Sequence, residues 1–219
     1  MSLRGGFIYV PPSQSGKKTT RRHLLTATVA FTCLPLTAAE PESTSLYNGK
    51  DLTGWVMKDG SPANATFWKS VDGVLTGEND PAKKGSMLYT KDNYLNFECE
   101  AEARWQGELD SGFMVRKPEL QMQIGVSRGL KKDMTKSFYT GSYPEAGQVK
   151  EAAKLLKAGD WNQFQLVAQG DTVTVWINGT EASKFNDAKY AGAGPIGLQI
   201  HGGLAMKIGF RNLKIKALK

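Results

Sequence analysis

The chain has 219 residues, with 28 Lys and Arg against 21 Asp and Glu, and a formal net charge of +7. Five of the basic side chains and none of the acidic ones lie in residues 1–39, so the remaining 23 and 21 leave residues 40–219 with a net charge of +2. A basic balance that comes from one terminal segment gives no reason to expect a nucleic-acid partner.

Residues 1–39 are typical of an export signal. Basic residues at 17–22 precede an apolar run at 24–36, and small residues follow at 37–39. The run is shorter than the roughly 20 residues that a membrane-spanning helix needs, and residues 20–25 (TRRHLL) resemble a twin-arginine signal. We predict a signal peptide over 1–39, a linker over 40–45, one domain over 46–218, no membrane span, and a periplasmic or secreted location.

Cofactor motifs are missing from the sequence of this domain. Cys99 is the only cysteine after the leader, so no internal disulfide can form there. We find no paired-cysteine or His-x-x-x-His spacing for zinc and no glycine-rich phosphate loop. We predict no cofactor, and leave open a divalent ion such as calcium held by carboxylates.

The first half of the domain contains clear strand patterns. Residues 68–77 predict a hairpin around Asp72-Gly73, because this pair supplies the positive φ angles of a tight turn. A short strand is expected at 86–90. Residues 97–105 alternate strictly, which predicts an inward set and a charged, solvated outward set. The inward set is Phe97, Cys99, Ala101, Ala103 and Trp105.

Residues 119–125 form another alternating segment, after an expected strand at 111–116. Leu120, Met122 and Ile124 share one face of this strand. The opposite face carries Glu119, Gln121 and Gln123. Carboxamides donate and accept hydrogen bonds at once and suit ligand hydroxyls, so this face is a candidate binding surface.

The second half returns to strands after a long irregular region. Residues 127–157 predict a functional or mobile loop with a helical turn at 151–156. Strands are expected at 161–168, 172–177, 180–185, 197–200 and 205–217. Turn signals every eight to twelve residues and almost no helical periodicity predict an all-β sandwich or barrel.

His201 is the only histidine after the leader, and it stands among glycines at the end of a predicted strand. Imidazole titrates near neutrality, which makes a histidine in this setting a candidate acid or base. The alternative is that His201 only caps a turn by hydrogen bonding.

Six segments resemble, in order, the motifs of the 3-keto-disaccharide hydrolase domain family. They are LYNGKDLTGW (46–55), DSGFMVR (110–116), WN (161–162), VWING (175–179), GPIGLQIHG (194–202) and FRNLKIK (210–216). The resemblance implies an all-β, concanavalin A-like jelly-roll sandwich, export, and action on sugars whose C3 hydroxyl has been oxidised to a ketone. The family commonly has an acid where this chain has Gln121. If that acid does chemistry in the family, this chain either lacks catalysis or places it on Glu119, Asp110 or His201.

A 3-keto sugar changes what the site must supply. Ordinary glycosidases use two carboxyl groups, and the sequence identifies no such pair with certainty. A C3 ketone acidifies the hydrogen at C2, so a single base can start elimination of the aglycone from C1. We expect His201 or Glu119 as the base and Arg116 as the donor to the ketone oxygen. The expected substrate-binding residues are Asp110, Gln121, Gln123, Trp105, Tyr143 and Gln199.

The sequence also fits structural roles for individual site residues and non-catalytic roles for the whole domain. Asp110 lies in a turn where its side chain can bond its own backbone, and a strand-end arginine such as Arg116 is often a surface or salt-bridge residue. The fold also hosts non-catalytic, lectin-like carbohydrate-binding modules. A third alternative is a scaffold that presents the lysines of the 127–157 loop to an envelope partner.

Overall fold

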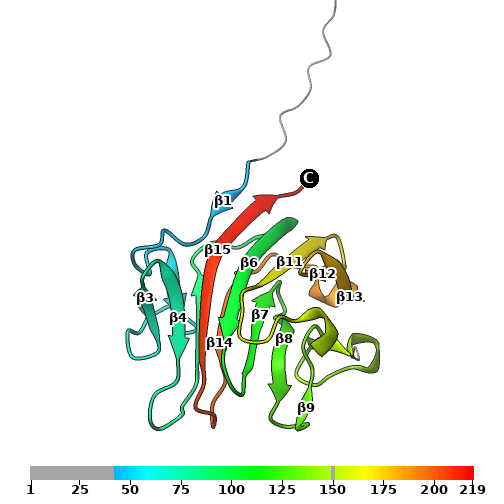
Figure 1. Cartoon of the computed structure of the whole chain (residues 1–219). Coiled ribbons are helices and arrows are strands. Elements are labelled where there is room, and N and C mark those ends of the chain that lie inside the picture. The colour runs from blue at the N-terminus through cyan, green and yellow to red at the C-terminus, as the bar shows by residue number, and fades with distance from the viewer. Residues whose placement is uncertain (1–41, 149–150) are drawn as a thin grey trace, which may run out of the picture. The chain divides into compact units, whose positions relative to one another are not determined.

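Two antiparallel β-sheets pack face to face in the computed structural model, which describes residues 42–148 and 151–219 (Figure 1). The signal peptide predicted over 1–39 lies outside the described residues. The eight-stranded sheet contains, in order, β13 (Thr180–Asn186), β12 (Thr172–Ile177), β11 (Asn162–Gln169), β6 (Phe97–Trp105), β15 (Lys207–Ala217), β4 (Val74–Glu78) and β3 (Trp68–Val71), with β1 (Thr44–Ser45) paired to β15. The seven-stranded sheet contains β10 (Phe138–Tyr139), β8 (Leu120–Ser127), β7 (Asp110–Val115), β14 (Gly197–Ile200), β5 (Ser86–Thr90) and β2 (Trp55–Met57), with β9 (Lys132–Asp133) paired to β8.

The all-β jelly-roll sandwich expected from the sequence is confirmed, and the only helical pieces among the described residues are the 3₁₀ turns η1 (Glu145–Gly147), η2 (Ala152–Leu155) and η3 (Ala188–Tyr190). No helix in the described ranges is long and apolar enough to cross a membrane. The hairpin predicted around Asp72-Gly73 is formed by β3 and β4, with Val71 paired to Val74.

The core lies between the two sheets and follows the predicted alternation. On β6, Phe97, Cys99, Ala101 and Ala103 are at most 2% exposed, while the acidic residues between them are half-buried. Trp105 ends the same strand and is only partly buried at the edge of the core. Burial of one face therefore fixes the register of this strand, because a one-residue slip would expose every core side chain.

The seven-stranded sheet is buried on both faces, although antiparallel sheets usually leave one face to solvent. Its inner face packs Phe113 and Met122 into the core, and its outer face carries side chains such as Gln121 and Gln123 that are also buried. Residues of the segment 127–148 cover this outer face. The long loop predicted at 127–157 is thus partly structured, since it contains β9, β10, η1 and η2.

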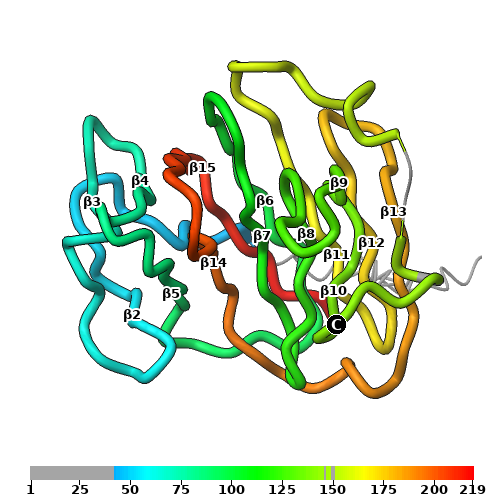
Figure 2. Tube along the Cα trace, turned by 90° about the horizontal axis from the view of Figure 1, so that it is seen from below, coloured from blue at the N-terminus to red at the C-terminus, as the bar shows by residue number. Residues whose placement is uncertain are grey.

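Strand order brings distant segments of the chain together (Figure 2). β14 pairs with β7 on one side and with β5 on the other, so residues near 200, 110 and 87 lie side by side. At the chain start, Thr44 and Ser45, which fall in the predicted linker, pair with Ile215 and Lys214 of β15. The six motifs that are dispersed in sequence are therefore held within one layered structure.

Candidate active site

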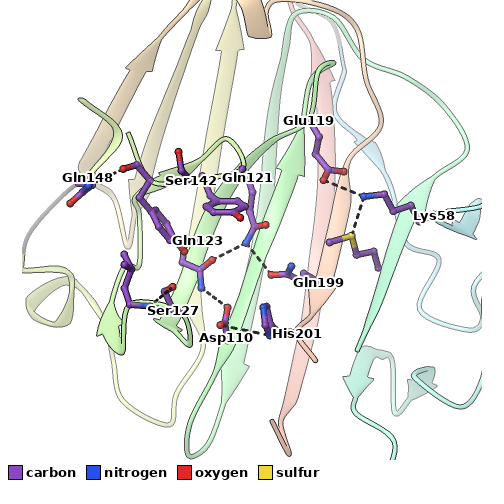
Figure 3. A pocket seen from close by; sticks show the side chains of 16 residues that line it. Lys58, Asp110, Glu119, Gln121, Gln123, Ser127, Ser142, Gln148, Gln199 and His201 are labelled. Atoms are coloured by element: carbon purple, nitrogen blue, oxygen red, sulfur yellow. Dashed lines mark hydrogen bonds and ion pairs between the residues drawn. The ribbon is translucent and has the colours of Figure 1, made fainter. Parts of the chain in front are cut away.

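A cavity of about 850 Å³ lies over the outer face of the seven-stranded sheet (Figure 3). Its lining comes from five of the strands and from the segment that covers them. The lining residues are Lys58, Met87, Asp110, Glu119, Gln121, Gln123, Ser127, Gly129, Leu130, Tyr139, Gly141, Ser142, Tyr143, Gln148, Gln199 and His201. Seven of the nine residues expected from the sequence at the site lie here, and the other two, Arg116 and Trp105, do not line it.

Three carboxamides form the floor of the cavity. Gln121 Nε2 donates to Gln123 Oε1 at 2.8 Å and to Gln199 Oε1 at 3.0 Å. Gln123 Nε2 in turn donates to Asp110 Oδ1 at 2.8 Å. The row joins β8, β7 and β14, and each member is at most 7% exposed. Hydrogen bonds between these buried amides hold their side chains in place, so their remaining polar atoms can be presented to a ligand in fixed directions.

Gly112 makes this amide row possible. It lies on β7 opposite Gln123, between the strands that carry Gln121 and Gln199. A Cβ atom at this position would lie 2.6 Å from the Met122 carbonyl oxygen and 2.8 Å from Gln121 Nε2. Only glycine therefore lets the Gln121 side chain cross β7 to meet Gln199.

Asp110 begins β7 and is 3% exposed. Besides the bond from Gln123, its Oδ2 accepts a hydrogen bond from the Arg128 backbone N–H at 2.9 Å. Both donors lie far along the chain, so the carboxylate is not closing a local turn. Asp110 is an acceptor aimed at the cavity end where β7 and β14 meet.

His201 follows the last residue of β14 and faces the same end of the cavity (Figure 3). Its Nδ1 lies 2.7 Å from the Gly202 carbonyl oxygen and 3.9 Å from Asp110 Oδ2. Both neighbours are acceptors, so Nδ1 carries the hydrogen and Nε2 of the neutral ring keeps its lone pair. The side chain is 43% exposed and lines the cavity. His201 thus caps a turn and lines the cavity at once.

A second polar cluster closes the opposite end of the cavity. Glu119, in the turn before β8, accepts a hydrogen bond from the Tyr89 hydroxyl and lies 3.7 Å from Lys58 Nζ. Burial, followed by the hydrogen bond to Glu119, raises the pKa of Tyr89 above its usual value, so the phenol stays a donor at neutral pH. No local sequence pattern marks Tyr89 or Lys58 as a site residue.

Two tyrosines line the cavity from the covering segment. Tyr139 on β10 pairs with Gln121 of β8, and its ring centroid lies 5.0 Å from that of Tyr143. Burial, with a smaller contribution from the charge of Asp110, raises the pKa of Tyr143 to about 12. Tyr143 is therefore neutral at physiological pH and presents both a ring and a hydroxyl to the cavity. Tyr139 lines the cavity but is not among the site residues expected from the sequence.

Arg116 does not reach the cavity. By strand alternation it would share the outer face with Asp110 and Met114, but its φ of +68° is left-handed and ends that alternation. Its guanidinium donates instead to the carbonyl oxygens of Ala191, at 3.1 Å, and Gly170, at 2.9 Å. The expectation that Arg116 contacts a sugar ketone in this cavity is therefore wrong.

Trp105 does not line the cavity either. It ends β6 in the eight-stranded sheet, which is the other layer of the sandwich. Trp105 is not among the residues that line the cavity, so the structure does not bring it together with the other expected sugar-binding residues.

The cavity contains few ligands for a metal ion. Within the described ranges, no three His, Cys, Asp or Glu side chains are grouped as a metal site would require. Asp110 and His201 form a pair without a third such member. The absence of a cofactor and the open option of calcium both stay predictions.

The fold and the site define a jelly-roll β-sandwich protein with a rigid, amide-floored cavity suited to a hydroxyl-rich ligand. Residues 42–216 match the model of the 3-keto-alpha-glucoside-1,2-lyase-like domain, and the chain belongs to this family. The family expected from the six motifs is thereby confirmed.

Solved structures of similar fold support this placement. A candidate glycosyl hydrolase from Parabacteroides distasonis is 25% identical, with a TM-score of 0.61 over 81% of this chain and 94% of that one. Another from the same organism is 28% identical, with a TM-score of 0.59 over 80% and 84%. A β-glucanase from Bacillus licheniformis, 14% identical with a TM-score of 0.56 over 83% and 99%, shares the fold. A comparison with curated proteins returns no match.

Proposed function

We propose that this chain is an exported enzyme that cleaves the glycosidic bond of 3-keto-glycosides by elimination across C2 and C1. Family membership supports this class of substrate. The single observation that carries the mechanism is the pairing of His201 with the buried carboxylate of Asp110 at one end of an amide-floored cavity.

The spacing of the cavity carboxylates disfavours an ordinary glycosidase. Asp110 lies opposite Gly125 in the β7–β8 register, and Glu119 precedes Gly125 by six residues. At about 3.3 Å per residue their positions lie about 20 Å apart along the strand. Retaining and inverting glycosidases need carboxyl groups about 5–5.5 Å and 6.5–9.5 Å apart, and the wide separation of the two backbone positions disfavours either arrangement. A mechanism with one base fits the cavity better.

His201 is the proposed base. Its Nε2 takes the proton from C2, which a C3 ketone has made acidic, and the electron pair moves into an enolate. When the enolate collapses, a double bond forms between C1 and C2 and the C1–O1 bond breaks; the aglycone leaves with its oxygen and takes up, directly or through water, the proton that the His201 imidazolium gives back. The carboxylate of Asp110 stabilises the imidazolium formed in the first step, as an acid partner does for other catalytic histidines.

Gln199 replaces Arg116 in our assignment as the donor to the ketone oxygen. Gln199 Oε1 is fixed by the hydrogen bond from Gln121 Nε2, and Gln199 lines the cavity beside His201. A pre-oriented amide donor aimed at a developing enolate is the kind of group that stabilises such a charge. Tyr143 supplies a ring against which a sugar face packs.

A non-catalytic carbohydrate-binding module is the second candidate. Gln121, which stands where the family has an acid, is fully engaged with Gln123 and Gln199 and contributes to a binding floor without adding a charge. That observation favours binding. It does not account for the Asp110–His201 pair, which pure binding of a neutral sugar does not require.

Incubation of the purified protein with 3-keto-trehalose and with methyl 3-keto-glucoside, with and without a chelator, separates the candidates. We expect loss of substrate and appearance of the free aglycone, unchanged by the chelator. Binding without product would exclude the enzyme and leave the binding module, and neither binding nor product would exclude both. Export is tested separately, by fusing residues 1–39 to a reporter and locating it outside the bacterial cytoplasm.

A further inference from the structure

Glu119 lies at the end of the cavity remote from His201, and its carboxylate is held in a defined direction (Figure 3). We propose that Glu119 determines specificity by binding the hydroxyls of the aglycone unit, and that it takes no part in proton removal. This inference rests on the proposed function. It assigns a different role to a residue that the sequence alone left as an alternative base.

The length of the cavity separates Glu119 from the reacting carbon. The backbone N–H of His201 donates to the Asp110 carbonyl oxygen, so both residues lie at the same level of the sheet. The backbone of Glu119, in the turn before β8, lies six residues from that level, a distance of about 20 Å between backbone positions. A sugar ring whose C2 lies against His201 takes that end of the cavity, and a second unit linked through O1 can extend over Gln123 and Gln121 towards the end where Glu119 lies.

Tyr89 fixes the Glu119 carboxylate. Its ring lies at Gly197 of β14, where a Cβ atom would come within 2.5 Å of the ring. Tyr89 is 7% exposed, so its hydroxyl is an immobile donor to Glu119 Oε2. Glycine at 197 therefore allows a side chain from β5 to orient one that comes from the β7–β8 turn.

The exposed hydrogen-bonding groups of Glu119 and Lys58 suit a sugar unit that carries hydroxyls. The Glu119 side chain is 39% exposed, and its second oxygen lies 3.7 Å from Lys58 Nζ, which is itself 65% exposed. A carboxylate that accepts and an ammonium that donates can together satisfy neighbouring sugar hydroxyls. An apolar aglycone would displace water from both charges and return no hydrogen bonds, which disfavours it.

The test compares two substrates that both release an alcohol. Glu119→Gln and Tyr89→Phe are assayed with 3-keto-trehalose, which has a hydroxylated aglycone, and with methyl 3-keto-glucoside, which has none. We expect Glu119→Gln to lower kcat/KM on 3-keto-trehalose roughly 10–100-fold, as for loss of hydrogen bonds to a charged group, mainly through KM. The methyl glycoside should change little. Tyr89→Phe should show the same selectivity with a smaller loss.

Glu100→Gln on the eight-stranded sheet is the matched control, and its activity on both substrates should equal that of the wild type. Equal losses by Glu119→Gln on the two substrates would place Glu119 at the reacting carbon and overturn the inference, as would no loss on either. A wild type that cleaves neither substrate refutes the proposed function, and the inference falls with it.

Discussion

The imidazole Nδ1 of His201 lies 3.9 Å from Oδ2 of the buried Asp110 carboxylate and 2.7 Å from the Gly202 carbonyl oxygen. The two residues meet because β14 pairs directly with β7. The ring is held by the hydrogen bond of Nδ1 to the Gly202 carbonyl oxygen, with the Asp110 carboxylate close by, which leaves the other nitrogen to act as a base. The site joins a local turn to a contact between distant strands.

A substitution at Arg116 tests the claim that this residue has a structural role and no catalytic one. Arg116→Met should lower the free energy of unfolding by about 1–3 kcal/mol, because the carbonyl oxygens of Ala191 and Gly170 lose their donors. kcat on a 3-keto-glycoside should stay close to that of the wild type. Denaturant titration and steady-state kinetics provide the two readouts, and Lys117→Met at the exposed neighbour is the control. Loss of activity with unchanged stability would restore Arg116 to the site.

An acid at position 121 should be costly in this chain. Gln121 Nε2 donates to two amide oxygens, and an ionised carboxylate in its place would face both with no hydrogen to give. We expect Gln121→Glu to lose about 1–3 kcal/mol of stability at pH 7.

The same repulsion should raise the pKa of the introduced carboxyl group above the unfolded value. The stability deficit of Gln121→Glu should therefore be smallest below about pH 4 and grow as the pH rises. Unfolding curves at several pH values check this, with Gln163→Glu on the exposed face of β11 as control. A variant as stable as the wild type at pH 7 would mean that the amide row rearranges freely.

The Cys99 thiol should be unreactive in the folded protein. Burial, with a smaller contribution from Glu100, raises the pKa of its thiol to about 12, so almost no thiolate exists at pH 8. In a Cys33→Ser background, a thiol reagent should label Cys99 only after denaturation. Labelling of the native protein at pH 8 would contradict the burial.

The raised pKa of the Cys99 thiol also predicts how the free energy of unfolding changes with pH. The thiol is protonated in both states below about pH 9, and above it only the unfolded chain ionises readily. Stability should therefore fall from about pH 9 towards 12. Unfolding measured across this range should show a shallower fall for Cys99→Ala than for the wild type.

Much of the fold follows from local pattern. β6 and β12 have the bounds that strict alternation predicts, because burial of one face imposes a period of two on the side chains. The same period correctly placed Glu119, Gln121 and Gln123 together on the face that became the cavity.

The remaining parts of the site depend on strand order, which local pattern does not contain. Lys58 and Tyr89 reach Glu119 only because β2 and β5 follow β14 in the sheet. Arg116 was misplaced for a different reason. A left-handed backbone at a strand end reverses the expected side-chain direction, and nothing in the DSGFMVR segment marks that position in advance.

Turnover of methyl 3-keto-glucoside by His201→Gln tests the central claim most directly. This substrate does not reach Glu119 in our assignment, so its rate reports on proton removal at C2. We predict that the variant keeps the thermal midpoint of the wild type. Its kcat/KM should fall roughly 10²–10⁴-fold, which is the usual contribution of a general base. A folded variant that turns the substrate over as fast as the wild type would contradict the assignment of His201 as the base.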